Sequence, residues 1–151
     1  MNEYHFTFCS TDCVALASGA LFLPQHELLC VSDLHLGKSE RIARRSGTML
    51  PPYEVQETLQ KLSDDIARTS PNSVICLGDS FDDLDAAQSL SNDMRLWLTG
   101  MQAGRDWVWI EGNHDAGPVD LGGEYLEELR VGGLLFRHIA QPAFDLPEDL
   151  I

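Results

Sequence analysis

The sequence predicts an α/β fold, in which short buried strands alternate with helices to form a parallel sheet. Three apolar runs of strand length, Leu28–Val31, Val74–Leu77 and Trp107–Ile110, are each followed by polar residues. A helical pattern lies between the first and second runs, and another lies between the second and third. Because the crossovers of βαβ units are right-handed, we expect the three strands to be parallel and to end at the same edge of the sheet.

The chain before these units is expected to add short strands. Tyr4–Phe8 alternates apolar and polar residues, which predicts a half-buried strand. Val14–Leu16 and Ala20–Leu23 are predicted strands, with Ser18-Gly19 as the turn between them. Pro24–Glu27 then forms a loop.

Helical patterns connect the strands. Lys38–Ser46 is compatible with a short helix, and Pro51-Pro52 opens a longer one that ends before Pro71. Its predicted buried stripe consists of Val55, Leu59, Leu62 and Ile66. A second helix is predicted over Asp85–Leu98, with a loop over Thr99–Arg105.

A Gly-rich loop is expected after the segment Gly112–Asp115. Glu124–Leu129 is predicted as a helical turn, and Arg130–Leu135 as a hairpin through Gly-Gly. The second arm of this hairpin, Leu134–Phe136, is followed by Arg137 and His138. A fourth strand therefore also ends close to a side chain that can bind a metal ion.

Composition limits the classes of protein that fit. Hydrophobic residues make up 44% of the 151 residues, which excludes a disordered chain. No apolar run approaches the roughly 18 residues that a membrane helix needs, and the N-terminus lacks the pattern of a signal peptide. The four cysteines include no Cys-x-x-Cys pair, so we expect reduced, core or near-core thiols in a cytoplasmic protein.

Metal-binding side chains follow each predicted strand of the parallel sheet. Asp33 and His35 follow the first strand, Asp79 follows the second, and Asn113 and His114 follow the third. Ligands gather at the carboxyl ends of strands in open α/β sheets, and oxygen and nitrogen donors suit divalent ions. The pattern therefore predicts a metal centre at this edge.

Two divalent ions about 3.5–4 Å apart can clamp a phosphoryl group and supply a nucleophile from water. Asp79, in the central motif, is expected to bridge the ions. Asp33 and His35 would be further ligands of one ion, and Asn113 and His138 would be further ligands of the other. His114 is placed to polarise the phosphate or to protonate the leaving alkoxide.

Structural roles are the alternative for each of these residues taken singly. Asp33 and Asp79 can cap helices, and Asn113 and Asp115 can serve a turn. Asp82 and Asp83 can supply the N-terminal charge of the next helix. Possible metal ligands follow four successive predicted strands, and this coincidence favours the metal centre. Asp82 and Asp115 are then expected to form hydrogen bonds with the metal ligands.

The charge balance is acidic, with 10 basic and 24 acidic residues and a net charge of −14. This argues against nucleic acid, whose binding depends on Lys and Arg. However, Lys38, Arg41 and Arg45 follow the first motif directly. They either contact phosphate or form an exposed helix face, and bound cations would add positive charge nearby.

These motifs resemble the calcineurin-like metallophosphoesterases, whose signature is Asp-x-His, Gly-Asp and Gly-Asn-His-Asp/Glu. The matching segments are Asp33–His35, Gly78-Asp79 and Gly112–Asp115, with His138 where the next metal-binding histidine of the family stands. The segment Val31–Ser39, followed by Pro51-Pro52, is similar to one bacterial branch, the ligase-associated DNA damage response endonucleases.

The resemblance implies a four-layer α/β/β/α sandwich and phosphodiester hydrolysis by a two-metal centre. Manganese is the expected metal, with Fe, Zn and Ni as alternatives. The resemblance also implies His114 as the catalytic histidine and Asp79 as the bridge. For the branch it implies DNA as substrate and repair ligase or helicase partners.

One departure is that the sequence contains no Gly-His-x-His segment, from which the family takes one further histidine for each ion. We therefore expect residues 1–151 to be a single metallophosphoesterase domain that is a truncated form, with an incomplete second sheet and a tendency to form homo-oligomers through an unpaired edge. The alternative functions are a small-nucleotide phosphatase or pyrophosphatase and a catalytically incomplete metal-binding form.

Overall fold

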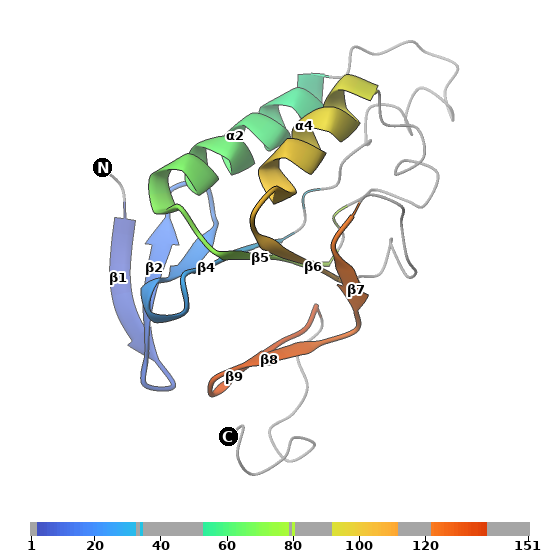
Figure 1. Ribbon diagram of the computed structural model, residues 1–151. Helices are drawn as coiled ribbons and strands as arrows, with labels where there is room; N and C mark the ends of the chain where they lie inside the picture. Colours follow the sequence, from blue (N-terminus) through green and yellow to red (C-terminus); the bar gives the residue numbers. More distant parts are fainter. Residues whose placement is uncertain are drawn as a thin grey trace, which may run out of the picture.

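The computed structural model describes residues 3–32, 34, 53–78, 80, 92–111 and 122–138. These residues form a mixed α/β fold with a seven-stranded sheet, a two-stranded sheet and helices on one face of the larger sheet (Figure 1). The predicted fold class is confirmed. Three of the four expected layers, helices, large sheet and small sheet, are formed by the described residues.

The seven-stranded sheet follows the order of the chain. Its strands are β1 (Glu3–Phe8), β2 (Thr11–Leu16), β3 (Leu21–Leu23), β4 (Leu28–Val31), β5 (Ser73–Leu77), β6 (Asp106–Ile110) and β7 (Glu124–Leu126). Neighbours from β1 to β4 are antiparallel, and those from β4 to β7 are parallel. The predicted parallel pairing of the three central strands is therefore confirmed.

The short connections before β4 also follow the predictions. Gly19 has a φ of 96° in the turn between β2 and β3, where its N–H donates to the Leu16 carbonyl at 3.0 Å. A 3-10 turn, η1 (Pro24–His26), then leads into β4. All four residues of β4 are buried, as its continuous apolar sequence predicts.

The first strand differs from the prediction of a half-buried strand, because every residue of β1 is exposed. Tyr4 is 69% exposed and Phe8 59%. β1 lies at the end of the sheet, beside β2 alone, and none of its side chains packs into either apolar core, so the alternation of residue types does not lead to burial. The rings of Tyr4 and Phe6 stack on each other, with centroids 5.8 Å apart.

Helix α2 (Tyr53–Thr69) confirms the predicted long helix. Leu59, Leu62 and Ile66 of its predicted stripe are buried. Arg68, in the last turn, forms an ion pair of 2.7 Å with Glu3, which ties α2 to β1.

Helix α4 (Asn92–Gln102) continues beyond the predicted end at Leu98. The prediction of a loop over Thr99–Arg105 is therefore wrong for its first half. Met101 lies three residues after Leu98 and is also buried, so a further turn adds apolar contact. Arg105 stabilises this turn, because its Nη1 donates to the Met101 carbonyl at 3.0 Å. The predicted start at Asp85 lies outside the described residues.

The segment from Glu124 is a strand, and the prediction of a helical turn there is wrong. β7 pairs with β6 in parallel, and Glu111 N–H donates to the Leu126 carbonyl at 2.9 Å. Tyr125 packs on one face of the sheet and Leu126 on the other. A strand of only three residues is too short for this two-residue alternation to be recognised in the sequence.

The predicted hairpin is present as β8 (Leu129–Val131) and β9 (Leu134–Phe136), joined by Gly132-Gly133. Gly132 has a φ of 58°, which the turn requires and glycine adopts at little cost. The hairpin forms the two-stranded sheet, which covers the face opposite the helices (Figure 1).

Two apolar cores hold the layers together. Alternate residues of the central strands, such as Val74 and Trp109, pack against α2 and α4. The intervening residues, such as Ile75 and Ile110, pack against Leu134 and Phe136 of the hairpin. Parallel strands buried on both faces account for the continuous apolar runs in the sequence. Within the described ranges, no helix is long and apolar enough to span a membrane.

Candidate metal centre at the strand ends

The carboxyl ends of β4, β5 and β6 lie side by side at one edge of the sheet. Val31 is opposite Cys76, and Leu77 is opposite Ile110. The three central strands therefore end within a residue of one another. This is the arrangement that places the side chains following each strand in a common region.

The carbonyl oxygen of Leu77 connects three segments at this edge. Ser32 Oγ, just after β4, donates to it at 3.2 Å. His138 Nδ1, two residues after β9, lies 2.9 Å from the same oxygen. A carbonyl has two lone pairs and can accept both bonds. The hairpin is thus joined to the ends of β4 and β5 through one backbone atom, which we call the Leu77 junction.

This contact determines the tautomer of His138. A carbonyl oxygen only accepts hydrogen bonds, so Nδ1 of His138 must carry the proton. The lone pair of the neutral ring then lies on Nε2. A histidine that donates from one ring nitrogen to a backbone carbonyl and offers the other to a cation is the usual form of a metal-binding histidine.

Gly78 allows His138 to approach this closely. A Cβ atom at position 78 would lie 2.3 Å from His138 Nδ1 and 2.5 Å from its Cγ. The φ of Gly78 is 88°, in the left-handed region that side chains disfavour. Both the backbone conformation and the imidazole therefore require glycine here, directly before Asp79 in the sequence.

Of the predicted site residues, only His138 is among those that the structure describes. The others lie outside the described residues, and they are Asp33, His35, Lys38, Arg41, Arg45, Asp79, Asp82, Asn113, His114 and Asp115. Their predicted roles stay predictions. Within the described ranges, no group of three or more His, Cys, Asp or Glu side chains could hold a metal ion.

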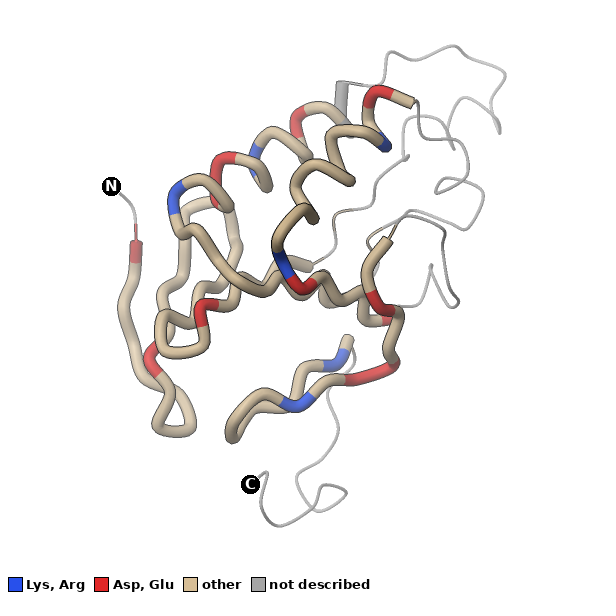
Figure 2. Tube along the Cα trace, viewed as in Figure 1, with Lys and Arg blue, Asp and Glu red and all other residues tan. Residues whose placement is uncertain are grey.

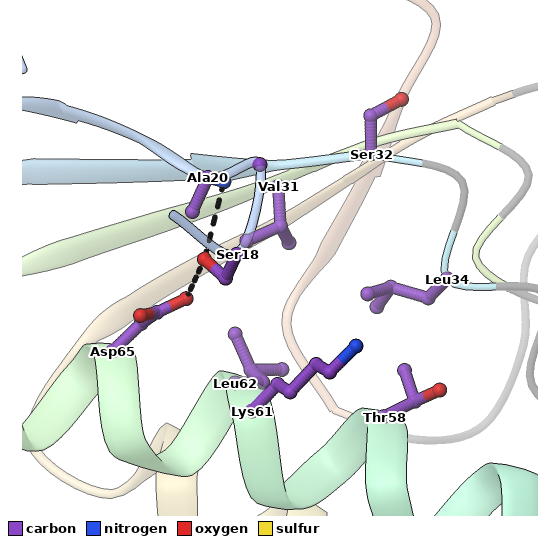
Figure 3. Close-up of a pocket in the computed structure, with 10 residues that line it drawn as sticks. Ser18, Ala20, Val31, Ser32, Leu34, Thr58, Lys61, Leu62 and Asp65 are labelled. Atoms are coloured by element: carbon purple, nitrogen blue, oxygen red, sulfur yellow. Dashed lines mark hydrogen bonds between the residues drawn. The ribbon is translucent and has the colours of Figure 1, made fainter. Parts of the chain in front are cut away.

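A cavity of about 370 Å³ lies beside the end of β4, and the sequence reasoning did not anticipate it. It is bounded by the β2–β3 turn, by Val31, Ser32 and Leu34, and by α2 (Figure 3). Asp65 of α2 is only 7% exposed and accepts a 2.5 Å hydrogen bond from Ser18 Oγ. The sequence did contain an indication of this site. Asp65 lies between Leu62 and Ile66 of the predicted buried stripe, where a carboxylate is rare.

Charged residues of the described part are mixed in sign. Acidic and basic residues alternate along α2, whereas the charged residues in the strands of the large sheet are acidic and the basic residues Arg130 and Arg137 lie on or beside the hairpin (Figure 2). Arg68 pairs with Glu3, and Arg137 Nη1 lies 2.9 Å from Glu128. These arginines thus neutralise carboxylates of the chain itself.

Comparison with known proteins agrees with this geometry. A family model described as calcineurin-like phosphoesterase matches residues 26–145. The crystal structure of Pseudomonas putida nuclease MPE superposes with a TM-score of 0.74 and 22% sequence identity, covering 93% of this chain and 68% of that chain. At this identity the superposition shows a common fold. None of the curated proteins matches the sequence. The family match extends over most of the chain, from before β4 to beyond His138, and the chain belongs to the calcineurin-like phosphoesterases, hydrolases of phosphoric esters.

Proposed function

We propose that this chain is a metal-dependent phosphodiesterase that hydrolyses DNA. The Leu77 junction is the observation that carries the proposal, because it brings His138 to the strand ends where the other metal-binding motifs follow in the sequence. The solved structure with the same fold is named a nuclease, which supports nucleic acid as the substrate. The family membership supports hydrolysis of a phosphoric ester.

The proposed centre holds two divalent ions, with manganese as the expected metal. Asp33 and His35 bind one ion, Asn113 and His138 the other, and Asp79 bridges the two. The Nδ1–H of His138 faces the Leu77 carbonyl, so this residue would bind a metal ion through Nε2. When bound, the ions supply Lewis acidity and a nucleophile from water near neutral pH.

The remaining chemistry belongs to side chains of the protein. His114 donates a proton to the leaving alkoxide, which would otherwise depart as a strong base. Lys38, Arg41 and Arg45 bind the phosphate groups of the substrate. Asp82 and Asp115 accept hydrogen bonds from the metal ligands and hold them in orientation.

Residues 1–151 act in this proposal as one phosphoesterase domain without the Gly-His-x-His segment. We further propose a cytoplasmic role in DNA repair, together with ligase or helicase partners, and self-association through an unpaired sheet edge.

The test measures hydrolysis of bis-p-nitrophenyl phosphate and of single-stranded DNA with added Mn²⁺. Removal of a ligand in Asp79→Ala is expected to abolish both activities. His138→Ala is expected to weaken Mn²⁺ binding by about tenfold or more, as loss of groups at metal sites does. The matched control is His5→Ala, since His5 is an exposed histidine on β1, with its side chain 71% accessible.

Each other outcome points to a different function. Hydrolysis of small nucleotides without DNA cleavage would favour a nucleotide phosphatase. Mn²⁺ binding without hydrolysis of either substrate would favour a catalytically incomplete form. Equal losses in His138→Ala and His5→Ala would contradict the proposed centre.

A further inference from the structure

The cavity beside the end of β4 has the size and the polar groups of a small-ligand site. Its volume of about 370 Å³ falls within the range of such pockets, which begins near 300 Å³. Its apolar wall comprises Val31, Leu34 and Leu62. A partly apolar ligand of nucleobase size therefore fits within this volume.

The polar groups of the cavity come mainly from one face of α2. Thr58, Lys61 and Asp65 are spaced by three and four residues, so they lie one above another on the helix. Asp65 is held by the 2.5 Å hydrogen bond from Ser18 Oγ, and Ser18 Oγ in turn accepts from Ala20 N–H at 3.3 Å. The carboxylate thus has a fixed orientation, and burial strengthens any further bond that it accepts.

Lys61 supplies the complementary charge. Its side chain extends from α2 toward the space between Val31 and Leu34, away from Asp65 (Figure 3). The cavity therefore offers an acceptor at one end and a cationic donor at the other, separated by about one helical turn. A simple anion matches only Lys61 and would be repelled by Asp65.

We propose that this cavity binds the guanine base of the substrate. A carboxylate only accepts hydrogen bonds, and guanine presents adjacent N–H donors at N1 and N2. Its Hoogsteen edge, which adjoins the N1 side, carries the acceptors O6 and N7, which suit the ammonium group of Lys61. Adenine and cytosine place an acceptor beside their amino group and so meet the Asp65 carboxylate with one donor only.

The inference rests on the proposed function, because it makes the cavity a subsite of the phosphodiesterase. Val31, Ser32 and Leu34 flank position 33, where the first metal-binding motif begins. Ser32 also donates to the Leu77 junction. A base held in the cavity therefore lies next to the strand ends where the phosphodiester is proposed to react.

The test measures binding of the four free nucleosides to the full chain by calorimetric titration in the absence of metal. We expect guanosine to bind most tightly, and Lys61→Met and Asp65→Asn each to weaken it by about tenfold, the typical effect of losing a hydrogen bond to a charged group. Asp64→Asn is the matched control, because Asp64 is exposed, lies next to Asp65 and accepts a hydrogen bond from Gln60 instead.

The outcomes separate this inference from the proposed function. Guanosine binding that depends on Lys61 and Asp65 supports the subsite, even if bis-p-nitrophenyl phosphate, which has no base, is not hydrolysed. Hydrolysis without guanosine binding overturns the subsite alone. Equal affinity for the four nucleosides, or equal losses in Asp64→Asn and Asp65→Asn, also overturns it. Lys61 is exposed, so Lys61→Met keeps the test valid if Asp65→Asn unfolds the chain.

Discussion

At the scale of single residues, the contact between Gly78 and His138 is the most constrained feature of the candidate site. Glycine is required at position 78 both by its positive φ and by the imidazole that takes the place of a Cβ atom. The glycine that precedes Asp79 in the motif therefore has a physical role of its own. It lets the histidine that follows β9 reach the end of β5.

Gly78→Ala is expected to lose more stability than a glycine replacement that causes backbone strain alone. Left-handed backbone costs a side chain about 1–2 kcal/mol, and the clash with His138 adds about 1–3 kcal/mol. Gly104→Ala is the control, since Gly104 has a φ of 74° and nothing within 4 Å of its added Cβ. Urea denaturation measures both changes. Equal losses would show that His138 moves away without cost.

Sequence reasoning reached His138 but not its hydrogen bond. His138 follows the apolar run Leu134–Phe136, which predicted a strand that ends close to a possible metal ligand. Only neighbouring residues in the sequence are needed for this prediction. The bond to the Leu77 carbonyl joins residues 61 positions apart, which pattern along the chain does not encode. The role of His138 as a metal ligand stays a prediction.

At the scale of elements, burial decided which predictions succeeded. The strands β4, β5 and β6 and the helix α2 were predicted because each has a long or continuous apolar pattern. β7 was predicted wrongly because three residues are too few to show a period. The end of α4 was missed because Gly100 and Thr99 are poor helix formers, while burial of Met101 outweighs their propensity.

Met101→Ala tests whether burial extends α4. Truncation of a buried methionine is expected to lower the free energy of unfolding by about 2–4 kcal/mol. Leu96→Ala, on the same helix, is the control, because Leu96 is 70% exposed and its truncation should change stability by less than about 0.5 kcal/mol. Urea denaturation distinguishes the two. A small loss in Met101→Ala would mean that Arg105 alone holds the last turn.

At the scale of the whole molecule, the two cores on either side of the large sheet determine stability and its dependence on pH. Cys13, Cys30 and Cys76 are buried thiols, as expected for reduced core cysteines, whereas Cys9 is exposed in the β1–β2 turn and departs from that expectation. Burial raises the pKa of Cys30 from 9.0 to about 12. The folded protein therefore keeps this proton at pH values where the unfolded chain loses it.

We expect the stability of the protein to fall between pH 9 and about 12. In that range the unfolded state binds fewer protons than the folded state, so Cys30 contributes a loss of about 1.4 kcal/mol per pH unit. Cys30→Ala should show a shallower dependence, measured by urea denaturation at several pH values under reducing conditions. Val108→Ala, which truncates a buried side chain of the same apolar core and removes no ionisable group, should keep the wild-type slope. Parallel slopes in all three proteins would contradict the assignment to Cys30.

The Leu77 junction has a consequence for the apparent strength of the small sheet. A two-stranded hairpin is marginal by itself, and β8–β9 is held at its far end by the His138 imidazole, whose Nε2 is proposed to bind a metal ion. Any ion bound there favours the docked hairpin by mass action. Adding Mn²⁺ should therefore slow deuterium uptake at the amides of β8 and β9 more than at those of β1 and β2, as measured by mass spectrometry. Uniform slowing, or none, would mean that metal binding does not stabilise the docked hairpin.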